Sequence, residues 1–301
     1  MKNILFIVTF FSFCLTSTYS HTENYQRVAI AGGSITEIFY RLGEEQRIVG
    51  VDSTSQFPEP AKDHPTIGYV RNVSVEGVLS LEPDLLIGEL DTGPPKMLNQ
   101  IKATGVNTVI IEDDDTIPAI KEKITLIASL LGIEEKGIQL IKEIQLDLDA
   151  LAFAKQQLTS SPRVLFLLSL SNGAPIASGH TTSAHTAIIE AGGTNVLEKH
   201  KGWKKLSPES ALALKPDVII VMNRGEDVLQ QVEQLAHFKY TPAVKNKAVY
   251  TIDGGYLLGF GPRTPQAIVE LGSMIHQNFM LPKEYHFRYP RKQFQQATAG
   301  H

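Results

Sequence analysis

Cysteine is nearly absent from this chain of 301 residues, in which Cys14 is the only one. A single cysteine forms no internal disulfide, so the fold has to rely on core packing. The sequence also lacks a Gly-x-Ser-x-Gly elbow, a phosphate-binding loop, a dinucleotide fingerprint and an activated cysteine. We therefore expect a binding protein rather than an enzyme.

The chain also has a small net charge and only one long apolar run. The net charge is -4, which gives no sign of nucleic-acid binding, and the 43% hydrophobic content is that of a globular protein. The one long apolar run lies within residues 1–20, after Lys2, and is too short to span a bilayer comfortably. It is typical of a secretory signal peptide, with cleavage expected after Ser20. An uncleaved anchor and a lipoprotein at Cys14 are the alternatives, but bulky Phe13 disfavours the lipoprotein. We predict a soluble mature protein in the periplasm.

An internal repeat divides the remaining chain. The segment SVEGVLSLEPDLLI at 74–87 matches SPESALALKPDVII at 207–220, 133 residues later. Each copy predicts an N-capping serine, an acidic residue in the first helical turn, a short helix, a Pro-Asp turn and a buried strand. A period this long indicates duplicated domains rather than a solenoid.

Strand and helix patterns alternate in both halves. RVAIAGG at 27–33 and RVLFLLS at 163–169 are apolar runs that predict buried strands of parallel sheets. The first is followed by a predicted helix, SITEIFYRLG, in which Ser34 would be the N-cap, Glu37 would complete a capping box and Gly43 would end the helix. The predicted fold class is α/β in both halves.

One long helix is predicted between the halves, at 133–158, with apolar residues recurring every three or four positions. A helix of about 25 residues would be roughly 37 Å long and would join two lobes stiffly. We therefore predict two Rossmann-like lobes, at 21–132 and 159–282, with the ligand in the cleft between them. For the tail at 283–301, a disordered end and a lobe-packing extension both remain open.

The stretch Gly-Tyr-Val-Arg at 68–71 carries the most specific chemistry in the first half. In an extended segment, residues two apart point to the same side, so Tyr69 and Arg71 can project into one space. A cation beside a phenol favours the phenolate form. Ordinary surface decoration is the alternative explanation of this pair.

Taken together, these features resemble the substrate-binding proteins of bacterial ABC importers for vitamin B12, ferric siderophores and haem. The segments GGSITEIFYRLG, VGVD, IGYVRNVSVEGVLSLEPDLLIG, GPPKML, RVLFLLS and DGGYLLGFGPRTPQA are similar to the periplasmic haem-binding branch. The resemblance covers roughly residues 27–280.

This resemblance implies that the ligand is ferric haem b and that Tyr69 is its axial iron ligand. Hard anionic oxygen suits Fe(III) better than Fe(II), as in tyrosine-ligated haem enzymes. Arg71 would then tune the phenolate, and a surface salt bridge is its alternative role.

The resemblance also implies a permease dimer in the inner membrane as partner, with a monomeric carrier. Glu76 and Glu209 occupy equivalent places in the repeat and would meet arginines of the permease, one lobe on each subunit. Acidic residues are favoured in a first helical turn for local reasons as well.

A second-lobe histidine ligates the iron in some family members, but at the matching place this chain has residues 170–172, Leu-Ser-Asn. His180, in the loop that follows, is the remaining candidate for a second ligand. His185 is expected to serve packing or capping instead.

The glycine-rich segment 253–267 would form another wall of the haem pocket. Tyr256 would offer a stacking or hydrogen-bonding face, and Arg263 would pair with a propionate. A structural turn is the alternative role of this segment. Backbone N–H groups near Gly33 and Ser34, at a helix start, would form a further carboxylate cradle.

Two other ligand classes stay open. A zinc or manganese carrier would need converging histidine and acidic ligands, whereas the nine histidines are scattered. A ferric-siderophore or vitamin B12 carrier is the nearer alternative, because the two-lobed framework does not separate these ligands.

Overall fold

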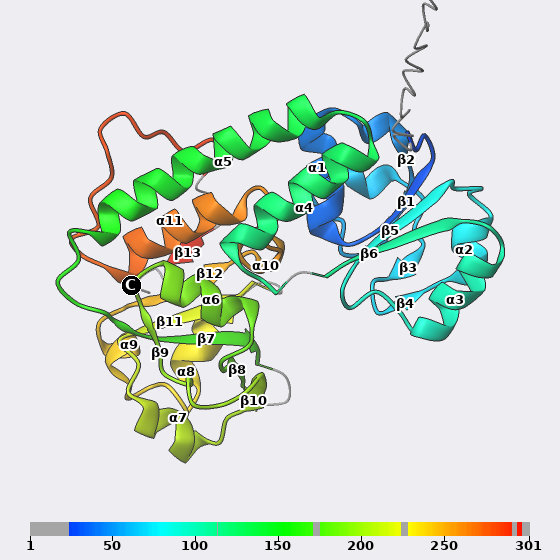
Figure 1. Cartoon of the computed structure of the whole chain (residues 1–301). Coiled ribbons are helices and arrows are strands. Elements are labelled where there is room, and N and C mark those ends of the chain that lie inside the picture. The colour runs from blue at the N-terminus through cyan, green and yellow to red at the C-terminus, as the bar shows by residue number, and fades with distance from the viewer. Residues whose placement is uncertain (1–23, 113, 171–174, 224–227, 291–293, 297–301) are drawn as a thin grey trace, which may run out of the picture.

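A computed structural model describes residues 24–112, 114–170, 175–223, 228–290 and 294–296. The predicted signal peptide lies outside the described residues. Two α/β lobes are joined by a single long helix, α5, which starts beside α1 and α4 of the first lobe and runs along the top of the second lobe in this view (Figure 1). Within the described residues, no helix has the length and apolar character needed to span a bilayer.

The first lobe is built on a four-stranded parallel sheet with the order β2-β1-β5-β6. A separate two-stranded hairpin, β3–β4, lies beside it. The elements are β1 (Val28–Ala31), α1 (Gly33–Leu42), β2 (Ile48–Val51), β3 (Gly68–Tyr69), β4 (Asn72–Val73), α2 (Val75–Leu79), β5 (Leu85–Glu89), α3 (Pro95–Ala103), β6 (Asn107–Ile111) and α4 (Ile117–Leu130), with 3-10 turns at Glu45–Arg47 and Glu59–Asp63.

The second lobe has a mixed sheet with the order β10-β8-β7-β11-β12-β13. Strands β7, β11 and β12 are parallel, and β8 and β13 run antiparallel to their neighbours. The elements are β7 (Arg163–Ser169), β8 (Ile176–Ser178), α6 (Ser183–Glu190), β9 (Thr194–Asn195), β10 (Trp203–Lys205), α7 (Pro208–Leu214), β11 (Val218–Met222), α8 (Val228–Gln234), α9 (Pro242–Lys245), β12 (Val249–Ile252), α10 (Gly254–Leu258), α11 (Thr264–Ile275) and β13 (Phe294–Gln296).

The sequence repeat corresponds to one structural unit in each lobe. Ser74 caps α2 and Ser207 caps α7, each accepting a hydrogen bond from a backbone N–H three residues on. Asp84 accepts the backbone N–H of Arg27 (3.1 Å), and Asp217 accepts that of Arg163 (2.9 Å). Each aspartate of the Pro-Asp turn thus holds the start of the neighbouring central strand, which explains why the repeat contains it.

Helix α1 differs from its predicted start. Gly32 is the N-cap, and Ser34 already lies inside the helix that begins at Gly33. Neither Ser34 nor Glu37 forms a capping box, because both side chains make longer-range contacts described below. The predicted end is confirmed, since Gly43 adopts the left-handed conformation after Leu42.

The connecting helix α5 spans Glu134–Lys155, so its 22 residues are about 33 Å long. Its buried residues join two different cores: Leu140 and Ile144 pack in the first lobe, and Leu151 packs in the second. Since one continuous helix is part of both cores, the lobes are joined stiffly. The described part of the tail packs against this helix and supplies β13 to the second sheet.

Candidate functional site

Both lobes turn the carboxyl ends of their parallel strands toward one pocket of about 650 Å³, here called the interlobe pocket. The residues after β1 and β5 come from the first lobe, and those after β11 and β12 come from the second. Ligands of open α/β sheets bind at this edge. The lining residues used below are Gly33, Ser34, Glu37, Phe57, Glu59, Lys62, Tyr69, Arg71, Glu89, Asp91, Met222, Asp253, Gly254, Gly255 and Arg263.

Tyr69 lies at the tip of the β3–β4 hairpin and is 44% exposed. The preceding Gly68 has a φ of 104°, and a Cβ there would lie 2.7 Å from the carbonyl oxygen of Asn72. Only glycine fits this tight turn without strain. Buried Asp52 accepts the backbone N–H of Val70 (3.2 Å) and that of Gly32 (2.9 Å), which ties the hairpin to the start of α1.

Arg71 reaches the hydroxyl of Tyr69, as their two-residue spacing predicts. Its Nη1 donates to the phenol oxygen at 3.2 Å, while its Nη2 pairs with Asp91 at 2.7 Å. Gly93 holds the Asp91 loop against the hairpin through backbone bonds with Val70 and Val73. The pocket rim therefore presents an exposed phenol with an anchored cation beside it.

Gly33 and Ser34 line the pocket, but their N–H groups are already used. Ser34 donates from its backbone N–H (3.3 Å) and its hydroxyl (2.7 Å) to Glu89, and Gly33 donates to Thr54. Lys123 in turn donates to the hydroxyl of Ser34 (2.8 Å). The expectation of a cradle for a ligand carboxylate here is wrong in this arrangement, because a protein carboxylate already occupies the helix start.

Arg263 is buried in the wall of the pocket and paired across the two lobes. Its Nε and its backbone N–H donate to the carboxylate of Glu37 at 2.8 and 2.9 Å. Burial raises the pKa of Glu37, and Arg263 opposes that rise. The guanidinium carbon lies 3.4 Å from the ring centroid of Phe57. Arg263 lines the pocket as expected, but as the partner of Glu37.

Tyr256 does not face the pocket. Its side chain is fully buried in the second lobe, and its hydroxyl donates to Glu270 (2.6 Å) and accepts from Gln266 (2.9 Å). Burial, reinforced by the charge of Glu270, raises the pKa of this phenol. The expectation that Tyr256 contacts a ligand in this pocket is therefore wrong. Its neighbours Gly254 and Gly255 line the pocket instead.

His180 is also remote from the pocket. Strand β8 starts opposite Ser169, at the pocket end of β7, and runs away from it. His180 follows β8, where its backbone N–H donates to His200 (2.7 Å). The structure thus does not bring His180 to Tyr69. His185 packs beside Asn195, as expected, and burial lowers its pKa.

Several lining residues escaped the sequence analysis. Glu89 ends the buried strand β5 and Asp91 follows it, which is the pattern that could have identified them. Lys62 pairs with Glu59 (2.8 Å), and this ion pair lines the pocket together with the Arg71–Asp91 and Arg263–Glu37 pairs. Within the described segments, no three or more His, Cys, Asp or Glu side chains are arranged to hold a metal ion.

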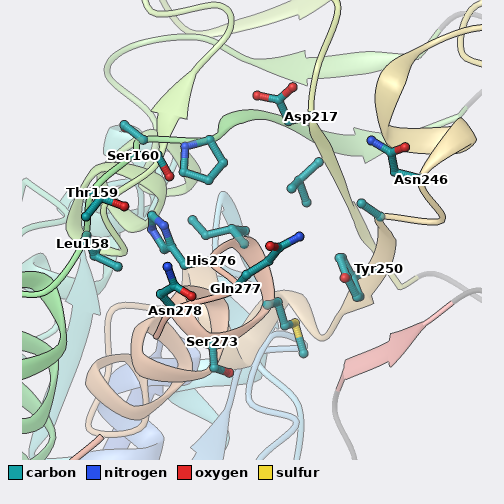
Figure 2. A pocket seen from close by; sticks show the side chains of 16 residues that line it. Leu158, Thr159, Ser160, Asp217, Asn246, Tyr250, Ser273, His276, Gln277 and Asn278 are labelled. Carbon is teal, nitrogen blue, oxygen red and sulfur yellow. The ribbon is translucent and has the colours of Figure 1, made fainter. Parts of the chain in front are cut away.

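A second pocket of about 650 Å³ lies at the other end of the second lobe (Figure 2). It is lined by Asp217 and Ala248, at the amino ends of β11 and β12, and by His276 and Gln277 after α11. It belongs to one lobe and to the strand edge that α/β proteins rarely use for ligands. The interlobe pocket is therefore the candidate site.

Comparison with known proteins agrees with this architecture. A family model described as periplasmic binding protein matches residues 28–256. The chain belongs to this family. Members of the periplasmic binding protein family bind and hand over ligands and are not enzymes, and those of ABC transporters work with membrane permeases.

The known proteins that are similar to this periplasmic binding protein include two haem-binding proteins and one vitamin B12-binding protein. The periplasmic haem-binding protein RhuT from Roseiflexus sp. RS-1, solved in apo form, is 35% identical with a TM-score of 0.80, covering 85% of this chain and 99% of that one. The haem-binding protein BhuT, solved with two haems, is 32% identical with a TM-score of 0.79, covering 83% and 97%. A vitamin B12-binding protein of Yersinia pestis is 26% identical, covering 67% and 71%.

Glu76 and Glu209 stand on corresponding surfaces of the two lobes of this binding protein. Each lies in the first turn of its helix, α2 or α7, and each is exposed. Hydrogen bonds from its own backbone N–H and from Ser207 lower the pKa of Glu209. Glu209 therefore presents a negative charge at the surface of its lobe.

Proposed function

We propose that this protein captures ferric haem b in the interlobe pocket, with the Tyr69 phenolate as axial iron ligand. The observation that carries the proposal is the exposed phenol of Tyr69 at the rim of a 650 Å³ pocket, 3.2 Å from the Nη1 of Arg71. A phenolate oxygen is a hard anionic donor that suits Fe(III), and the pocket volume is that of a site for one medium-sized ligand. Two haem-binding relatives above 30% identity support the choice of ligand.

The cations along the pocket fit the haem propionates. Lys62, Arg71 and Arg263 each already hold a protein carboxylate, so a propionate would exchange for or share that partner. We infer that Arg263, the buried one, keeps Glu37, and that the exposed pairs yield to the ligand. Glycines 254 and 255 leave room for the flat porphyrin on the second-lobe side.

Delivery is proposed to an ABC permease dimer in the inner membrane. Glu76 and Glu209 would each pair with an arginine of one permease subunit, since one lies on each lobe in an equivalent helix. The carrier would act as a periplasmic monomer after cleavage behind Ser20.

The test is a titration of hemin into the mature protein, followed in the visible spectrum. We expect a charge-transfer band of tyrosinate-bound high-spin iron, which Tyr69→Phe removes, together with a loss of affinity beyond about 100-fold. Tyr240→Phe is the matched control, because Tyr240 is 61% exposed with the Lys239 ammonium 5.8 Å from its ring. A band that survives Tyr69→Phe rules out the ligand assignment.

The vitamin B12 and siderophore alternatives are tested in the same assay. Cyanocobalamin and a ferric siderophore replace hemin, with quenching of the intrinsic fluorescence as the readout. Tight binding of either of them, with no saturable binding of hemin, would replace haem as the ligand and leave the two-lobed carrier unchanged.

A further inference from the structure

Tail residues near position 285 form polar contacts with the connecting helix α5. The hydroxyl of Tyr285 donates to Asp147 of α5 (2.8 Å). Arg288 pairs with the same carboxylate and also donates to the backbone carbonyl of Glu143. The segment from Tyr285 to Tyr289 therefore lies along α5, the element that joins the two lobes.

Tyr289 contacts both lobes at once. Its hydroxyl accepts a hydrogen bond from Arg41 of α1, and its ring meets the ring of Phe57 edge-on, with centroids 6.1 Å apart. Both of these partners belong to the first lobe. Its backbone N–H and carbonyl bond to Gln266 of α11, in the second lobe, at 3.0 and 3.1 Å. Burial raises the pKa of Tyr289 to about 12, so its hydroxyl stays protonated at neutral pH.

Gln266 links the tail to the buried interior of the second lobe. Its Oε1 accepts the backbone N–H of Arg288 (2.7 Å) as well as that of Tyr289. Its Nε2 donates to the hydroxyl of Tyr256 and to Glu270, both at 2.9 Å. The tail is therefore attached to a fully buried polar cluster rather than laid loosely on the surface.

A chain of contacts leads from Tyr289 to the pocket wall. The Phe57 ring contacts both the Tyr289 ring and the Arg263 guanidinium, whose carbon lies 3.4 Å from the Phe57 ring centroid. Arg263 in turn holds Glu37 of the first lobe. Phe57, Arg263 and Glu37 all line the interlobe pocket. A shift of Tyr289 would therefore reach the pocket through one intervening ring.

We propose that residues 285–289 form an interlobe clamp that holds the pocket open at a set width, with Tyr289 as the positioning residue for Phe57 and Arg263. A pocket held in its binding geometry loses less conformational freedom when the ligand enters, which raises affinity without a direct contact. The effect on haem rests on the proposed function, whereas the effect on lobe spacing does not.

The affinity arm compares three variants by hemin titration. Tyr289→Ala removes the ring and the hydroxyl and is expected to weaken hemin binding about tenfold, as supporting residues around a metal site do. Tyr289→Phe keeps the ring on Phe57 and should stay within about threefold of wild type. His286→Ala is the control in the same segment, because its side chain is exposed, and it should bind hemin as wild type does.

The spacing arm measures the lobes directly. Removal of the predicted signal peptide leaves no cysteine, so Lys102→Cys on α3 and Gln230→Cys on α8 accept spin labels at two exposed sites, one in each lobe. We expect a narrow distance distribution in the otherwise unaltered protein and in His286→Ala, and a broader one in Tyr289→Ala. If Tyr289→Ala does not fold, Tyr289→Leu replaces it with the same expectations.

The two arms separate the clamp from the ligand. A distribution and a hemin affinity that are both unchanged in Tyr289→Ala overturn the clamp, and so does an equal loss of affinity in Tyr289→Phe, which would mean that the ring contact plays no part. Broadening in a protein that binds no hemin supports the clamp and overturns only the proposed function.

Discussion

Removing the charge of Arg71 tests the proposal that this arginine stabilises Tyr69 as a phenolate ligand. The Nη1 of Arg71 lies 3.2 Å from the Tyr69 oxygen, and the Arg71 side chain is 65% exposed. At this distance, two unit charges attract by about 1.3 kcal/mol in bulk water and more strongly in the protein interior. Because the Arg71 side chain is mostly exposed, we use the value for water. Such an energy corresponds to about a tenfold change in a binding constant. Arg71→Ala should therefore weaken ferric hemin binding about tenfold.

The assay is a hemin titration at two salt concentrations. If the Arg71 charge favours the phenolate, Arg71→Ala should bind ferric hemin about tenfold more weakly than wild type at low salt. The difference should shrink in 1 M salt, where the Debye length is about 3 Å. Arg71→Lys keeps the charge and should restore most of the affinity.

Lys102→Ala is the matched control for lost charge, because Lys102 is exposed on α3 and does not line the pocket. The reasoning is refuted if Arg71→Ala binds hemin as tightly as wild type at low salt. It is also refuted if Arg71→Lys is as weak as Arg71→Ala, because the guanidinium shape rather than the charge would then be responsible.

Two further predictions concern stability and transport. Burial raises the pKa of Asp147 from 3.8 to about 6, which means that the folded protein favours the protonated carboxyl. The stabilisation that comes with this protonated form is fully present below pH 3.8 and is lost as the pH rises through 6. Asp147→Asn should therefore gain on wild type by about 2.4 kcal/mol between pH 4 and pH 8 in urea unfolding, because the unfolded carboxyl is already about half ionised at pH 4; a constant difference would show that Arg288 cancels the effect of burial. Glu76→Ala and Glu209→Ala should each leave hemin affinity unchanged and lower haem uptake by cells that rely on this importer, with the double variant lower still. Unchanged uptake in the double variant would contradict the docking role.

Local patterns predicted much of the fold. The serine caps of α2 and α7, the end of α1 at Gly43 and the long helix α5 all depend on residues within a few positions of one another. The pairing of Tyr69 with Arg71 belongs to the same class, because alternation along an extended segment is a property of the backbone. These features needed no knowledge of how the lobes pack.

The errors share a different origin. Ser34 and Glu37 have the spacing of a capping box, but Glu89 and Arg263 offered them stronger partners, 55 and 226 residues away. Tyr256 stands in a glycine-rich segment that reaches the pocket, yet its ring turns inward to Glu270. A sequence pattern contains no information about which distant charge will lie within hydrogen-bond reach.

By itself, the sequence determined the two lobes, the stiff helix between them and the phenol–guanidinium pair on one hairpin, because capping, periodicity and strand alternation act over a few residues. Only the tertiary structure decided which side chains close the pocket and what the tail does. It paired Arg263 with Glu37 across the lobes, sent His180 to the far end of β8 and laid Tyr289 over Phe57. Burying two opposite charges together, or two rings edge to edge, depends on where separate lobes meet, and that position is set by the packing of both cores on α5.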